Sequence, residues 1–131
     1  MTRDGVLIAS RQELALYQDL WAVYSRLSDG LAKEVAPDPA HLGAECARAA
    51  ALNAALRDLA AMLSPHRLAG AEVDSEISSV WRESATLAAA AADANRQLQS
   101  AARARQAKIT EHLATITGAR RASAGYQAAA R

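Results

Sequence analysis

Apolar residues recur every three or four positions along most of the chain, which is the spacing of one face of an α-helix. The longest segment with this spacing covers 74–118, and neither proline nor glycine interrupts it before its end. Asp74 or Ser75 can cap its beginning, and Gly118 can end it. We therefore predict one continuous helix over 74–118, about 65 Å long at about 1.5 Å per residue.

The apolar positions of this helix alternate three and four residues apart, as in the heptads of a coiled coil. They are Ile77, Val80, Ser84, Leu87, Ala91, Ala94, Leu98 and Ala101. The register slips near Arg105, and the stripe resumes as Ile109, Leu113 and Ile116. We interpret the slip as a stutter, which locally unwinds a coiled coil.

A shorter helix is predicted over 11–35. Ser10 and Glu13 have the spacing of a capping box, in which each side chain bonds the backbone amide of the other. A start near Asp4 is the alternative. Two adjacent apolar stripes give this helix a wide apolar face, which suits contact with two neighbours. Gly30 weakens the helix near its end and is a candidate kink.

A second helix is predicted over 39–63. Asp38 is a suitable N-cap, and Pro39 fits the first helical position, where its missing N–H has no partner to lose. Pro65 closes this helix, and Gly70 lies in the connection that follows, for which a short turn of helix over 65–71 is the alternative. Both connections are short, so consecutive helices should run antiparallel.

These elements predict an all-α protein with one domain over 1–131, an antiparallel three-helix bundle or coiled coil with a much longer C-terminal helix. Trp21 and Trp81 are expected to pack in it. The first two helices can cover only part of the third, which leaves the apolar positions near its C-terminal end in need of a partner. The tail, 119–131, has no apolar seam and is expected to be disordered, with Tyr126 as its one large side chain.

Charge is distributed unevenly along the chain. Residues 96–131 contain seven Lys and Arg against one Glu, or +6, whereas residues 1–95 contain eight against thirteen, or −5. The halves can complement each other within one molecule, or the basic half can face an acidic protein partner. Nucleic acid is not expected as a partner, because no aromatic platform accompanies the arginines.

The remaining composition narrows the function classes. The three histidines lack a second ligand at helical spacing, and no phosphate-binding glycine loop or activated nucleophile is present, so we expect neither an enzyme nor a metal or other cofactor. The single cysteine, Cys46, fits a reducing compartment. We find no signal peptide and no membrane-spanning run, and we expect a cytoplasmic protein without a membrane partner.

Three features resemble the C-terminal third of FlgN-type flagellar export chaperones: the sequence Asn-Arg-Gln-Leu at 95–98, the helix through Lys108, Ile109 and Leu113, and the segment 117–126 that ends in a tyrosine. The resemblance implies a cytoplasmic chaperone that masks the terminal helix of hook-associated proteins before type III export. It also implies a set of partner-binding residues: Leu98, Ile109, Leu113 and Ile116 facing the client, Arg105 and Lys108 steering it, and Tyr126 contacting the export gate.

The alternative is a structural or adaptor protein that self-associates, forming a dimer through the exposed end of its long helix. Both hypotheses depend on apolar positions that the rest of the chain does not cover. They differ in whether the covering helix comes from a client protein or from a second copy.

Overall fold

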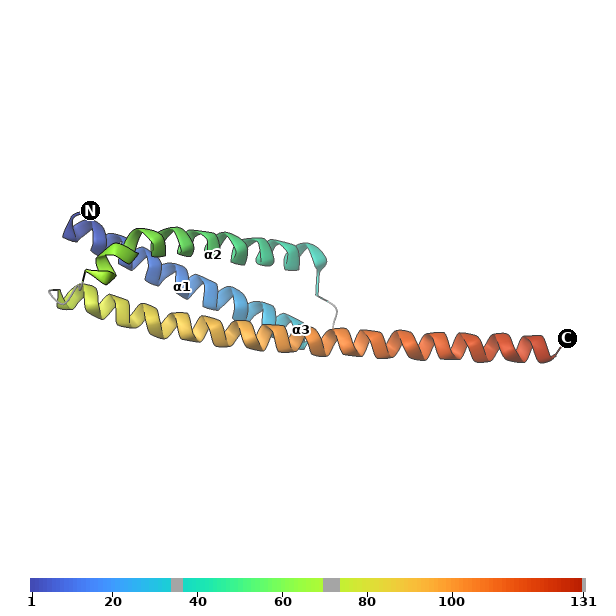
Figure 1. Ribbon diagram of the computed structural model, residues 1–131. Coiled ribbons are helices and arrows are strands. Elements are labelled where there is room, and N and C mark those ends of the chain that lie inside the picture. Colours follow the sequence, from blue (N-terminus) through green and yellow to red (C-terminus); the bar gives the residue numbers. More distant parts are fainter. Residues whose placement is uncertain (34–36, 70–73, 131) are drawn as a thin grey trace.

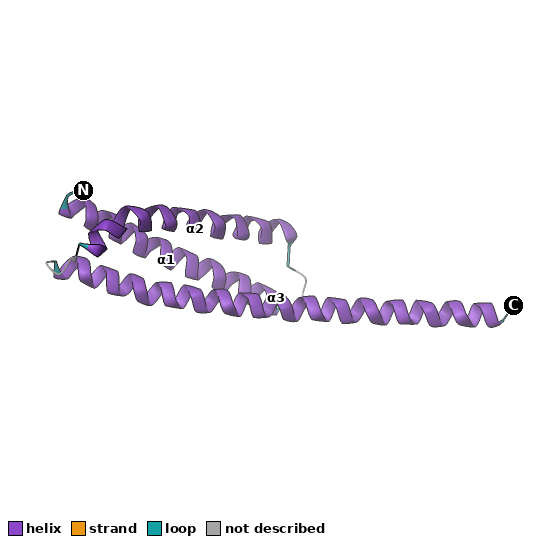
Figure 2. Ribbon diagram, viewed as in Figure 1, coloured by secondary structure: helices purple, strands orange, loops and turns teal. Residues whose placement is uncertain are grey.

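The computed structural model describes residues 1–33, 37–69 and 74–130, which form three helices and no strand (Figures 1 and 2). The helices are α1 (Arg3–Ala32), α2 (Pro39–Leu68) and α3 (Ser75–Ala129). The prediction of an all-α fold is therefore confirmed. None of these helices has an apolar run sufficient to cross a lipid bilayer.

Helix α1 is the packing partner of both other helices. The backbones of α2 and α3 each approach that of α1, and within the described residues they do not approach each other closely. Figure 1 shows α2 and the N-terminal part of α3 beside α1, whereas the C-terminal part of α3 extends past both. The packing is that of a helical bundle built on α1.

Two buried clusters form the core. The first joins α1 to the middle of α2 and α3 and consists of Leu20, Val23, Leu27, Ala49, Leu56 and Ala91. The second lies near the beginning of α1 and consists of Val6, Leu7, Ala9, Leu63 and Ile77. The buried side chains of α3 include Ala91 and Ala94, whose small size allows α1 to approach it closely.

Each helix begins at a capping side chain. Thr2 accepts a hydrogen bond from the amide of Gly5 at 3.1 Å, and Asp38 accepts one from Ala40 at the same distance. Asp74 accepts hydrogen bonds from the first amides of α3. The predicted caps Asp38 and Asp74 are confirmed, since each satisfies backbone donors that have no partner within the helix.

The predicted capping box at Ser10 and Glu13 is wrong, because α1 begins well before it and both side chains are buried. The Ser10 hydroxyl donates to the carbonyl of Val6 at 2.7 Å and accepts from the indole Nε1 of Trp81 at 2.8 Å. The alternative of an early start is the correct one. The two polar residues join helices instead of capping one.

Glu13 forms the most buried ion pair of the described residues, with Arg67 of α2. The Glu13 side chain is 3% exposed and that of Arg67 is 33% exposed, and both guanidinium nitrogens donate to the carboxylate. The guanidinium also stacks over the ring of Trp81, 5.3 Å from its centroid. Glu13, Arg67 and Trp81 therefore join all three helices at this point. Burial, together with the nearby charge of Glu13, raises the pKa of Tyr17 above its ordinary value.

The ends of α1 and α2 differ from their predicted positions. Helix α2 continues through Pro65 to Leu68 and bends in its last turns (Figure 1). This last turn includes Arg67, whose contacts with Glu13 and Trp81 offset the hydrogen bond that proline removes. Gly30 lies inside α1 without ending it. The predicted end of the first helix at 35 and the connection at Gly70 lie outside the described residues.

Trp21 is 46% exposed, which contradicts its predicted place in the core. The neighbouring stripe of α1, Leu20, Val23 and Leu27, faces α2 and α3 instead. Trp81 is partly buried and packs against the second cluster. Helix α1 carries two adjacent apolar stripes that are equally suited to burial. The positions of the neighbouring helices decide which of the two is buried.

Helix α3 continues to Ala129, past the end predicted at Gly118 and through most of the tail that was expected to be disordered. A glycine inside a helix costs about 1 kcal/mol relative to alanine. The surrounding residues are mostly alanine and other good helix formers, so the costs of Gly118 and Gly125 do not end the helix. The register slip near Arg105 is accommodated without a break.

We expect Arg67→Met to lower the free energy of unfolding by about 3 kcal/mol, because it leaves the buried Glu13 carboxylate without its partner. Adding Glu13→Gln should recover more than half of the loss, since no charge then remains buried. Urea denaturation followed by circular dichroism measures both effects. Equal stability of the single and double variants would contradict the role of this pair.

A second prediction concerns pH. Hydrogen bonding from Arg3 holds the pKa of Asp74 below its ordinary value of 3.8, so the ionised carboxylate favours the folded state. This contribution is complete above 3.8 and is lost as the pH falls below that value. Asp74→Asn keeps a capping side chain but cannot ionise. The wild type should be the more stable at neutral pH, and the difference should shrink in acid.

Candidate functional site

One continuous stripe of α3 faces α1. It includes Ile77, Ser84, Ala91 and Ala94, which are all buried, and then Leu98, which packs against the first core cluster. A straight helix drifts by about 20° in each heptad relative to a seven-residue repeat. The four-residue steps from Arg105 to Ile109 and from Ile109 to Leu113 each turn the stripe back by about 40°, so together they return it to its original face. The stutter thus keeps the later apolar positions on the same face of α3 that faces α1 in the bundle.

The stripe continues where α1 has ended. We call residues 106–129 of α3 the projecting segment, because Figure 1 shows this part of α3 extending past α1 and α2. On it Ile109 and Leu113 are 54% and 58% exposed, and only Ile116 is partly buried. The apolar stripe of α3, which α1 covers in the bundle, is therefore uncovered on the projecting segment.

A groove of about 570 Å³ lies in the corner between the end of α1 and α3. It is lined by the following residues: Leu31, Ala32 and Lys33 of the α1 end, and Ala101, Ala104, Arg105, Lys108, Ile109, His112 and Leu113 of α3. Its walls are mainly apolar, and its polar groups are basic. These properties suit an apolar helix face flanked by carboxylates.

Arg105 fixes the end of α1 against α3. Its guanidinium donates to the backbone carbonyl of Lys33 at 2.7 Å and to that of Leu31 at 3.3 Å. The last carbonyls of a helix have no partner within it, and a cation also complements the negative end of the helix dipole. Arg105 therefore shapes the groove and is not simply a free surface charge.

The other cations around the groove are available for a partner. Lys33 and Lys108 are exposed, and none of the described residues that line the groove is a carboxylate. Arg103, Arg120 and Arg121 make no ion pair within the described part of the chain, whereas four acidic residues of the bundle are paired with cations there. Among the described residues, Arg120 and Arg121 of the projecting segment therefore have no ion-pair partner.

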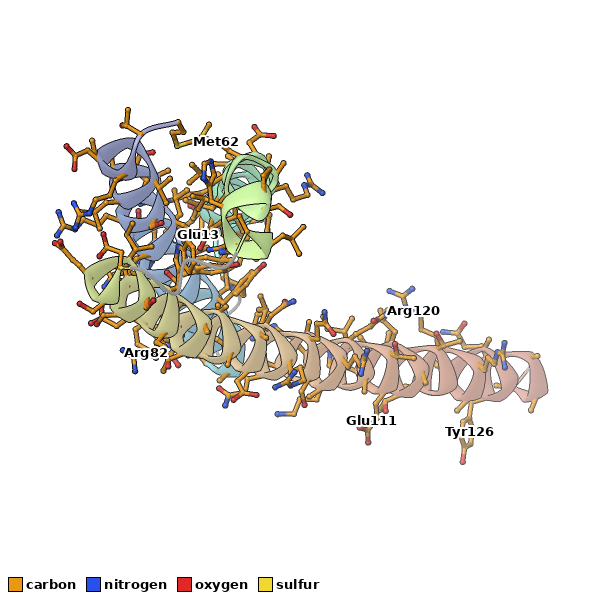
Figure 3. All side chains as sticks on the ribbon, turned by 60° about the vertical axis from the view of Figure 1, so that its left-hand side comes forward. Glu13, Met62, Arg82, Glu111, Arg120 and Tyr126 are labelled. Carbon is orange, nitrogen blue, oxygen red and sulfur yellow. The ribbon has the colours of Figure 1, made fainter. Side chains whose placement is uncertain are left out.

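The structure brings together four of the predicted partner-binding residues: Arg105, Lys108, Ile109 and Leu113 all line the groove. Leu98 does not join them, because it packs on the core. Ile116 lies farther along the same stripe. Tyr126 is 81% exposed near the end of α3 (Figure 3), and the groove does not include it.

Sequence reasoning missed the contribution of α1 to the groove. Leu31, Ala32 and Lys33 line it because α1 ends beside α3 at this level. The level at which α1 ends beside α3 can be predicted from the length of the first helix only when the residue at which that helix begins is known. His112 was also missed, although it lies four residues before Ile116 and therefore on the same side of the helix.

Metal-binding chemistry has no candidate in the residues that the structure describes, since no three His, Cys, Asp or Glu side chains gather there. Cys46 is exposed and free. No protein-family model, curated protein or solved structure matches this chain. Its function is therefore inferred from the groove and from the charges around it.

Replacing Arg105 should loosen the end of α1. In Arg105→Ala the carbonyls of Leu31 and Lys33 lose a charged donor, and we expect amide exchange in the last turn of α1 to accelerate about tenfold. Hydrogen exchange read by mass spectrometry or NMR measures this. Lys108→Ala is the matched control and should leave exchange unchanged. Equal rates in all three proteins would show that Arg105 does not hold the helix end.

Proposed function

We propose that this protein is a chaperone that binds a terminal helix of a partner protein along the projecting segment and in the groove. The observation that supports this most directly is the continuity of the α3 stripe, which α1 covers in one half and leaves uncovered in the other. A partner helix placed on Ile109, Leu113 and Ile116 would extend packing that the bundle already uses. Such helix-in-groove binding is a common mode of recognition.

The charges around this stripe support an acidic partner. Lys33, Lys108, Arg120 and Arg121 flank it and have no carboxylate partner among the described residues. Opposite charges across an interface speed association and exclude wrong partners. The client helix should therefore be amphipathic, with leucine-like residues on one face and carboxylates beside them.

The resemblance to FlgN-type chaperones supplies the cellular context of this proposal. In this context the client is a hook-associated protein, and its terminal helix is masked in the cytoplasm until type III export. The proposal takes the three helices as an antiparallel bundle whose last helix is much longer than the others. Tyr126, exposed and distant from the groove, would then be available to the export gate.

A second copy of the chain could also cover the stripe, because Ile109 and Leu113 are exposed in each copy. Charge disfavours this alternative. In an antiparallel pair centred on Leu113, Arg105 of each copy would face Arg121 of the other. Like charges at such positions destabilise paired helices.

The test is binding of the terminal helix of a hook-associated protein, measured by calorimetry and by light scattering. We expect a one-to-one complex with the wild type. Ile109→Asp combined with Leu113→Asp should weaken binding about a hundredfold or more, because two buried apolar contacts are lost and two carboxylates face an acidic helix. Circular dichroism should show unchanged helix content.

The matched control is Thr110→Asp combined with Ala114→Asp, which adds the same charges on the face of α3 that points away from the groove. This control should bind nearly as well as the wild type. Normal binding by the Ile109 and Leu113 variant would place the client elsewhere. A dimer of the wild-type protein that the same variant converts to a monomer would favour self-association instead.

A further inference from the structure

We propose that the partner helix, if the proposed function holds, enters the groove with its C-terminal end first. Its terminal carboxylate would lie between Lys33 and Lys108 beside the end of α1. The partner chain would then run in the direction opposite to that of α3.

The end of α1 closes the groove on one side. Leu31, Ala32 and Lys33 form this closed end, and Arg105 holds their backbone against α3. Figure 1 shows that the path along α3 toward its N-terminus is occupied by α1 from this point on. A helix lying on Ile109 and Leu113 must therefore end, or turn away, when it reaches α1.

The electrostatics at the closed end favour a helix C-terminus. The negative end of α1 is already complemented by Arg105, so the side chains of Lys33 and Lys108 leave an excess of positive charge among the described residues at this end. A helix dipole places about half a positive charge at its N-terminus and about half a negative charge at its C-terminus. A free terminal carboxylate adds a full negative charge to the latter.

The open end of the stripe is less selective. Beyond Ile116 the next residues on this face are polar, and Arg120 projects into solvent (Figure 3). Charges exposed in this way are screened by salt and discriminate weakly between helix ends. The stripe from Arg105 to Arg120 is about 22 Å long at about 1.5 Å per residue, so a partner helix of about 15 residues can cover it.

The first experiment uses a designed amphipathic peptide of this length, with leucine at heptad positions and glutamate beside them. The peptide is prepared with either a free C-terminal carboxylate or a C-terminal amide. We expect the carboxylate form to bind the full-length protein about fivefold more tightly. In Lys33→Gln combined with Lys108→Gln this difference should disappear. Arg120→Gln combined with Arg121→Gln is the control and should weaken both forms equally.

The second experiment determines the orientation directly by disulfide cross-linking. In a Cys46→Ser background, Ala104→Cys places a thiol at the closed end and Ser123→Cys places one at the open end. A peptide with cysteine near its C-terminus should cross-link to the first variant. Moving the peptide cysteine to its N-terminus should reverse the preference.

The outcomes separate this inference from the proposed function. Cross-linking of the C-terminal cysteine to Ser123→Cys, or equal affinity of the carboxylate and amide forms for the wild type, would overturn the orientation and leave helix binding intact. Failure of both peptide forms to bind would overturn both proposals. If the protein were then also dimeric by light scattering, a second copy would be the occupant.

Discussion

The constraint on which this structure depends is that α1 is the only surface shared by the other two helices within the described residues. Helix α2 packs on one part of α1 and the bundle portion of α3 on another. Within the described residues, α2 and α3 meet through side chains such as Arg67 and Trp81, without a close approach of their backbones. Where α1 stops, the cover of α3 stops as well. The position of the groove follows from this arrangement, since it lies at the last residues of α1.

Two arginines hold this arrangement at opposite ends of α1. Arg67 joins α2 to α1 through the buried Glu13 and stacks on Trp81 of α3. Arg105 joins α3 to the last carbonyls of α1. Guanidinium groups suit both places because their planar donors reach two acceptors at once and also stack on rings. The apolar core of the bundle is small and rich in alanine, so these directional contacts fix how the helices align.

Much of the fold could be predicted from sequence because it depends on local rules. The caps at Asp38 and Asp74 and the helical class follow from residue type and spacing alone. Ser10, Glu13 and Trp21 were misassigned for one physical reason: capping and burial were judged within one helix, whereas partners on other helices decided them. Pro65 and Gly118 show the same limit, since neighbouring contacts or neighbouring residues outweigh a single unfavourable position.

The candidate groove shows the same division between local and tertiary information. Ile109 and Leu113 were found from the heptad pattern, and Lys108 from the resemblance to FlgN-type chaperones. Lys33 required knowledge of where α1 ends. The uncovered length of α3 is the difference between two helix lengths, and this has an evolutionary consequence. Deleting one heptad from α1, with a matching deletion in α2, would lengthen the exposed surface by about 10 Å without altering any residue on it. Descendants of such a chain could match shorter or longer clients through insertions and deletions in the bundle, while the residues that contact the client stayed the same.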